Sequence, residues 1–153
     1  MSRAFVREAD VDAIETLPER PVSHHPNFVT AAGLRQIDAR LRELEAAREA
    51  AAGDAAALAR IERDARYWKQ RRVSARIIEP PATPLVARFG VTVQLRFPDD
   101  TERSFQIVGE DEADPAAGQV SWISPVATAL IGRVPGDSVE IFGRRATVIA
   151  LRA

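Results

Sequence analysis

The hydrophobic pattern of this chain changes its period once, and this change limits what the chain can fold into. Before Pro80, apolar residues recur every three or four positions, as they do along one face of a helix. After Pro84, they alternate with polar residues, which is typical of a half-buried strand. The 153 residues are enough for one domain with an appendage. We therefore expect a helical part, a proline-marked linker over 80–87 and a sheet domain over 88–153.

Two helices are predicted before the linker. Thr30 is a suitable N-cap, and two apolar seams with coiled-coil spacing follow it. Gly53 and Asp54 stand between the seams, where a glycine can end one helix and an aspartate can cap the next. The first seam consists of Leu34, Ile37, Leu41 and Leu44, and the second of Leu58, Ile61, Ala65 and Trp68 with Arg72 beyond.

The simplest arrangement of these helices is an antiparallel helical hairpin, a coiled coil over 30–79 with its tip near 53–54. Each helix of about 20 residues would be roughly 30 Å long, at 1.5 Å per residue. A single long helix that pairs with a second copy is the alternative, because a glycine within a helix costs only about 1 kcal/mol. We favour the hairpin, since the apolar seam thins to alanine around Gly53.

The C-terminal part predicts a small α+β domain, an antiparallel sheet with one short helix. Ser124 and Pro125 are typical of a helix start, with serine as the N-cap and proline at the first helical position. Strands are expected on both sides of this helix, over 91–97, 105–107, 120–123, 138–142 and 146–151. The core of the domain is expected to hold four aromatic residues, Phe89, Phe105, Trp122 and Phe142.

Residues 1–29 are predicted to form an irregular arm. Its prolines are incompatible with a continuous helix, although a short amphipathic element can form around Asp12–Leu17. His24 and His25 lack carboxylate or cysteine ligands at a suitable spacing, so we expect no metal site there. The arm is expected either to lie on another part of the protein or to bind a partner.

Composition excludes several classes of protein. The chain has no cysteine, which excludes disulfides and thiolate metal sites. It has no apolar run of about 18 residues and no apolar secretory stretch at its start, so we expect a cytoplasmic protein. The net charge is −1, but residues 30–78 carry a net charge of +4 between two acidic flanks. Such a basic segment is either a solvated face or a surface for an acidic partner.

The sequence offers no catalytic constellation. Both histidines lie in the arm, and no glycine-rich loop suited to phosphate occurs. Four carboxylates crowd one loop, but their spacing does not fit an EF-hand calcium site. We interpret this acidic loop as solvated or protein-binding, and its carboxylates are Glu110, Asp111, Glu112 and Asp114.

Four motifs follow one another in the C-terminal half. They begin at Arg88 (RFGVTV), Phe105 (FQIVGEDEAD), Ser121 (SWISPVATALIG) and Pro135 (PGDSV). Together they resemble the C-terminal domain of the GreA/GreB transcription elongation factors, which has an FKBP-like fold. The helical part is similar too, since Phe28–Leu34 resembles the family's entry to the first helix and Arg63–Glu79 its returning helix. The resemblance covers about residues 28–151 and leaves out the arm.

The resemblance implies a function on RNA polymerase. In this family the C-terminal domain docks beside the secondary channel, the hairpin enters the channel, and two acidic tip residues help to hold the second Mg²⁺ of the polymerase. The polymerase then cleaves backtracked RNA by metal-assisted hydrolysis, so the factor is not itself an enzyme and needs no cofactor of its own. Any contact with RNA or DNA in the elongation complex would be indirect.

The resemblance also assigns surfaces. Docking on the polymerase is expected at the helix start and the acidic loop, through Ser124, Pro125, Asp111 and Glu112. Basic residues of the second helix are expected to face the channel, and they are Arg60, Arg63 and Arg66. Three further basic residues are expected to be exposed either to the channel or to solvent, and they are Lys69, Arg71 and Arg72.

The hairpin tip departs from the family pattern. Gly53 and Asp54 match its first positions, but Ala57 stands where the family has its second acid. The hairpin is also several turns shorter, as in the Rnk-type relatives, which bind polymerase without supporting cleavage. Asp54, with Glu49 as a second candidate, is the tip acid that can approach a polymerase-bound metal ion, and a helix cap explains Asp54 equally well. We therefore expect little or no transcript cleavage.

Two other functions fit the same sequence. A Rnk-like regulator would act on another protein such as nucleoside diphosphate kinase. A peptidyl-prolyl isomerase would fit the FKBP-like fold, but fold does not imply function, and few aromatic residues are available for a proline pocket. For each of these functions we expect a monomer that does not contact a membrane.

Overall fold

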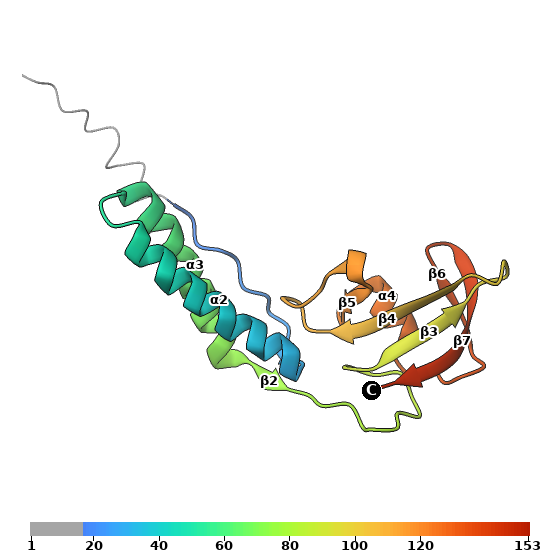
Figure 1. The fold of residues 1–153 in the computed structure, drawn as a ribbon. Coiled ribbons are helices and arrows are strands. Elements are labelled where there is room, and N and C mark those ends of the chain that lie inside the picture. The colour runs from blue at the N-terminus through green and yellow to red at the C-terminus, as the bar shows by residue number, and fades with distance from the viewer. Residues whose placement is uncertain (1–16) are drawn as a thin grey trace, which may run out of the picture. The chain divides into compact units, whose positions relative to one another are not determined.

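The computed structural model describes residues 17–153, so the element predicted around Asp12–Leu17 lies almost entirely outside the described residues (Figure 1). The chain separates into two compact units. The first contains Ile37–Ser74 together with the arm as far as His25, and the second contains Pro26–Gln36 and Ala75–Ala153. This division differs from the predicted segments, because it assigns the start of the first helix to the C-terminal unit. No helix among the described residues is long and apolar enough to cross a membrane.

The first unit is built on two helices, α2 (Ala31–Ala50) and α3 (Ala55–Ser74). Arg72 is paired with Asp38 at 2.6 Å, and Arg48 lies 3.9 Å from Glu62. Asp38 and Arg48 are ten residues apart on α2, and their partners Arg72 and Glu62 are ten residues apart on α3 in the opposite direction. The two helices are therefore antiparallel. The helical hairpin is confirmed, and the single long helix is excluded because the chain turns between Ala50 and Ala55.

The packing seam of the hairpin agrees with the predicted pattern except near its base. Ile37 and Leu44 are buried on α2, and the apolar seam residues of α3 are half-buried. Arg72 is exposed, whereas Arg71 is only 2% exposed, so the expectation that Arg71 faces a channel or solvent was wrong. The two positions follow Trp68 by three and four residues, and helical periodicity cannot choose between them.

The second unit contains a two-stranded parallel ladder. It pairs β1 (Phe28–Val29) with β2 (Arg76–Ile77). The arm was expected to be irregular through residue 29 and the hairpin to continue through residue 79, so both expectations were wrong at these strands. Alternation of apolar and polar residues is recognisable only over about four or more residues, so a strand of two residues cannot be predicted from the sequence pattern.

The second unit contains a five-stranded sheet in the order β5-β4-β3-β7-β6 (Figure 1). Its pairings are antiparallel except that β5 runs parallel to β4. One short helix, α4 (Pro125–Leu130), follows β5, as predicted. The strands are β3 (Thr92–Arg96), β4 (Glu102–Val108), β5 (Gln119–Ser121), β6 (Ser138–Ile141) and β7 (Arg144–Arg152), and a 3₁₀ turn at Pro115–Ala117 precedes β5.

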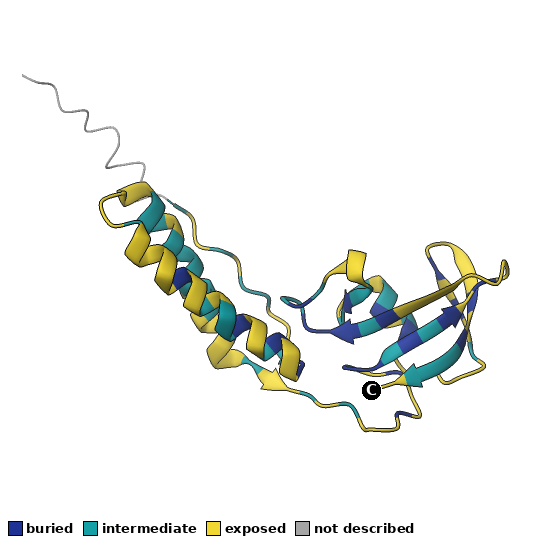
Figure 2. Ribbon diagram, in the orientation of Figure 1, coloured by how far each residue is buried: buried dark blue, intermediate teal, exposed yellow. Residues whose placement is uncertain are grey.

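The core of the second unit lies between the sheet and α4. Along β3, Val93 and Leu95 are fully buried and alternate with half-buried neighbours, which confirms the predicted alternation (Figure 2). Ala127 and Leu130 of α4 complete the core.

Phe105 is buried and Phe89 and Trp122 pack against the core, as expected, but Phe142 is 64% exposed. Placing Phe142 in the core was wrong because it occupies the β6–β7 turn. Phe142 and Gly143 there have φ values of 54° and 70°, which are the positive values that a tight hairpin turn requires at both central positions.

Candidate functional site

The hairpin tip carries one carboxylate, and that carboxylate caps a helix. Gly53 has a φ of 92°, a conformation that turns the chain after α2 at no steric cost to glycine. The backbone N–H of Asp54 then donates to the carbonyl of Ala51 at 2.9 Å. One side-chain oxygen of Asp54, Oδ1, accepts a hydrogen bond from the Ala57 N–H at 3.0 Å. Asp54 is therefore the N-cap of α3, and its side chain is exposed at the tip.

Replacing Asp54 by alanine is expected to lower the stability of the hairpin by about 1 kcal/mol, because the Ala57 N–H loses its acceptor. Asp54→Asn keeps an acceptor at the same place and should cost much less. Thermal unfolding followed by circular dichroism at 222 nm measures the difference. Equal melting temperatures for the two variants would show that the cap contributes nothing.

The other candidate residues at the tip do not complete a metal site. Glu49 is exposed on the last turn of α2, and Ala57 provides only its backbone to the cap. Within residues 17–153, no group of three or more histidine, aspartate or glutamate side chains is placed to hold a metal ion. His24 and His25 are both exposed. A metal ion near Asp54 would thus need most of its ligands from another molecule.

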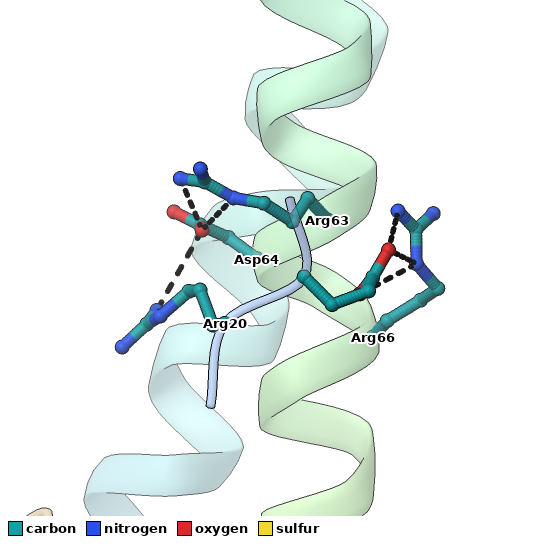
Figure 3. Close-up of polar contacts among 5 residues, drawn as sticks. Arg20, Arg63, Asp64 and Arg66 are labelled. Atoms are coloured by element: carbon teal, nitrogen blue, oxygen red, sulfur yellow. Dashed lines mark hydrogen bonds and ion pairs between the residues drawn. The ribbon is translucent and has the colours of Figure 1, made fainter. Parts of the chain in front are cut away.

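Two of the three basic residues predicted to face the channel are engaged within the chain (Figure 3). Arg66 donates from Nε and Nη2 to the carboxylate of Glu19 at 2.6–3.2 Å, which is a bidentate pair. Arg63 donates to the neighbouring Asp64 at 3.1–3.3 Å. Arg60 is exposed. The hydrogen bond from Arg66 lowers the pKa of Glu19 below its ordinary value.

The arm residue next to Glu19 also contacts α3. The guanidinium carbon of Arg20 lies 3.9 Å from the centre of the Tyr67 ring, and Arg20 Nη1 lies 3.7 Å from the carboxylate of Asp64. Sequence reasoning missed both arm contacts, although it expected the arm to lie on the protein or to bind a partner. An ion pair can be predicted from sequence when its residues are three or four positions apart on a helix. Glu19 and Arg66 are 47 residues apart, so their pairing could not be predicted in this way.

The predicted docking residues at the start of α4 lie on the surface of the second unit. Ser124 Oγ accepts a hydrogen bond from the Ala127 N–H at 3.2 Å, and the exposed Pro125 occupies the first helical position. A shallow hollow of about 440 Å³ opens beside them, lined by Pro125, Val126, Glu140, Ile141 and Phe142. The exposed ring of Phe142 makes this an apolar place on the surface.

The acidic loop is more structured than expected. Asp114 caps the 3₁₀ turn by accepting a hydrogen bond from the Ala116 N–H at 3.2 Å, and Asp111 is half-buried. Glu112 is only 6% exposed, and the Thr30 hydroxyl lies 2.6 and 2.7 Å from its two carboxylate oxygens. The loop was expected to be either solvated or protein-binding. At Glu112 the solvated alternative was wrong, since its carboxylate is buried and accepts a hydrogen bond from Thr30.

Thr30 links that carboxylate to the first helix. Its hydroxyl oxygen accepts a hydrogen bond from the Gly33 N–H at 2.9 Å, so Thr30 is the predicted N-cap of α2. A Cβ atom at Gly33 would lie 2.6 Å from Glu112 Oε2, which explains a glycine at this helical position. Phe28 packs nearby, with ring centres 5.0 Å from Trp122 and 6.0 Å from Phe89. These contacts attach residues 26–36 to the C-terminal unit.

Comparison with known proteins agrees with this architecture. Residues 82–150 match the family described as "Transcription elongation factor, GreA/GreB, C-term". The chain is 36% identical over 149 residues to transcription elongation factor GreA of Paracoccus denitrificans, a match that covers 81% of this chain and 96% of that relative. A second match, 56% identical over 55 residues to GreA of Methylobacterium nodulans, spans 35% of each chain. The chain belongs to the GreA/GreB family of transcription elongation factors.

The chain also matches two solved structures over most of its length. The GreA homologue Gfh1 of Thermus thermophilus has a TM-score of 0.42 and 20% identity, covering 84% of this chain and 100% of that one. A GreA/GreB factor of Nitrosomonas europaea has a TM-score of 0.41 and 18% identity, covering 82% of this chain and 98% of that one.

Proposed function

We propose that this protein binds RNA polymerase at the secondary channel and modulates elongation without strongly stimulating transcript cleavage. Membership of the GreA/GreB family supports the polymerase as partner. The hairpin tip carries the proposal on cleavage. It presents Asp54 with one oxygen used as a helix cap, and alanine at position 57, where the family pattern has a second acid.

Physical chemistry explains why one such carboxylate is insufficient. A hard cation such as Mg²⁺ needs several oxygen ligands at about 2.0–2.1 Å, so small errors in reach abolish binding. Each helix of this hairpin has 20 residues and spans about 30 Å. A short hairpin whose tip acid already uses one oxygen as a helix cap can therefore enter the secondary channel without completing the metal site of the polymerase. In this role the protein is not an enzyme, has no cofactor of its own and competes with longer Gre factors.

The test is displacement of a labelled, cleavage-competent Gre factor from core RNA polymerase by the full chain. We expect displacement at micromolar concentration or below. Absence of displacement would contradict binding at the secondary channel, and capture of nucleoside diphosphate kinase instead would favour a Rnk-like regulator.

A second assay measures transcript cleavage in a backtracked elongation complex. We expect no more cleavage with the protein than with polymerase alone, and no change with Asp54→Ala. Glu49→Ala is the matched control, because it removes the other exposed acid near the tip without touching the cap. Strong cleavage with the unchanged chain would overturn the proposal on cleavage, and the two variants would show which tip acid it needs.

A further inference from the structure

The described end of the arm, residues 17–25, lies along α3 in the first compact unit, and we refer to it as the strap (Figure 1). Two neighbouring side chains of the strap hold it there. Glu19 forms the bidentate pair with Arg66, and Arg20 lies near Asp64 (Figure 3). Arg20 also lies over the Tyr67 ring. Its guanidinium carbon lies 5.7 Å from the centre of the Trp68 ring. We call the contacted surface the strap face, and it consists of Asp64, Arg66, Tyr67 and Trp68.

The strap is held by contacts that can be broken without unfolding the hairpin. The side chains of Glu19 and Arg66 are 61% and 55% exposed, and ion pairs that face water contribute little and weaken with salt. The Arg20–Asp64 contact is long, at 3.7 Å. Pro18 and Pro21 keep the strap extended whether or not it is bound, so its attachment orders few additional backbone angles.

We propose that the strap face is a binding site for an extended, proline-containing peptide segment of a partner protein that carries a carboxylate side chain, and that the strap occupies this site until the segment displaces it. The present occupant defines the chemistry of the ligand. Arg66 is oriented to hold a carboxylate by two parallel hydrogen bonds, and the strap that supplies this carboxylate is extended and proline-containing. A partner segment needs the same features, and a cationic side chain over Tyr67 would add to its binding.

One polar atom of the strap face favours a partner over the strap. Trp68 Nε1 is buried and has no hydrogen-bond acceptor among the described residues. The Trp68 ring stands edge-on to Tyr67, with ring centres 5.2 Å apart. A partner segment that placed a carbonyl oxygen at Nε1 would form a hydrogen bond that the strap leaves unformed, and a buried donor gains from such a bond. The proposal concerns the free protein and does not depend on binding to polymerase.

The test uses the full chain and a fluorescent peptide with the strap's own sequence, Leu17–Asn27, as the probe. In the unchanged chain the strap competes at an effective concentration on the order of millimolar, so the probe should bind poorly. Glu19→Arg repels the strap from Arg66 and leaves the strap face intact, and we expect it to bind the probe at least about tenfold more tightly. Arg66→Glu should not bind this probe, because the carboxylate site is lost.

Two further variants separate the strap from general charge effects. The double variant Glu19→Arg with Arg66→Glu restores the ion pair in reverse, so a probe with arginine in place of Glu19 should bind to it more weakly than to Arg66→Glu alone. Glu79→Arg changes the net charge as Glu19→Arg does at an exposed position outside the strap, and it should behave like the unchanged chain. Circular dichroism at 222 nm confirms that each variant keeps its helices. Equal probe binding by the unchanged chain and Glu19→Arg, binding of the unchanged probe by Arg66→Glu, or no binding by any variant would overturn the proposal.

Discussion

Replacing Ile37 by alanine is expected to lower the free energy of unfolding of the hairpin by about 2–5 kcal/mol. Ile37 is 1% exposed, and Leu44 is the other buried apolar side chain of α2 besides it. On α3 every apolar seam residue is half-buried rather than buried. A large part of the fully buried apolar surface of this thin structure therefore belongs to one side chain, and its removal leaves a cavity that two helices can close only partly.

Urea unfolding monitored at 222 nm measures this loss, because the helical signal comes mainly from α2 and α3. The control is Val73→Ala, since Val73 on α3 is 88% exposed and its truncation should change stability by no more than about 0.5 kcal/mol. A similar effect of the two substitutions would contradict packing of the hairpin through Ile37. Polymerase binding by the Ile37 variant should fall in step with its folded fraction.

Replacing Glu112 by alanine is expected to cost about 1–3 kcal/mol, because Thr30 loses the acceptor for its hydroxyl in a buried place. Glu112→Gln keeps an acceptor of nearly the same shape and should cost less. The substitution should weaken the contacts of residues 26–36 with the rest of the C-terminal unit. Denaturant unfolding followed by tryptophan fluorescence reports it, since Trp122 contacts Phe28 there.

Gly33 provides a second and sharper readout of the same contact. In the unchanged chain, Gly33→Ala forces its Cβ toward Glu112 Oε2, 2.6 Å away, and should destabilise the protein. In the Glu112→Ala background that obstacle is gone, and alanine should stabilise α2 by up to about 1 kcal/mol through its helix propensity. The effect of Gly33→Ala on stability is thus expected to change from a loss in the unchanged chain to a gain in the Glu112→Ala background. Equal effects in the two backgrounds would show that the close approach does not constrain position 33.

The strongest sequence predictions were those with a long period or a strict local motif. The hairpin follows from two seams of coiled-coil spacing, and its turn follows from Gly53 and Asp54, whose roles as turn and cap are local chemistry. The start of α4 at Ser124 and Pro125 was predicted for the same reason. Each of these features is decided within a few residues of chain, so a single sequence is sufficient to find it.

The candidate site was predicted less completely because its contacts join distant residues. Arg63 and Arg66 were expected to be available to a partner, but Asp64 and Glu19 occupy them. Glu112 was assigned to a loop expected to be solvated or protein-binding, but it is buried and bonded to Thr30, 82 residues away in the sequence. Charge and hydropathy identify such side chains as polar, but they do not show which of them form hydrogen bonds with one another in the folded protein.

By itself, the sequence determined the class of each part of this protein: a helical hairpin with one acid at its tip, followed by a small sheet domain with one helix. Periodicity and capping are properties of neighbouring residues, and they survive in any tertiary arrangement. Only the tertiary structure decided that Glu19 of the strap pairs with Arg66, that Glu112 contacts Thr30 and that Phe142 stays exposed. These outcomes depend on which surfaces meet once the chain has folded, and no local pattern of residues records that choice.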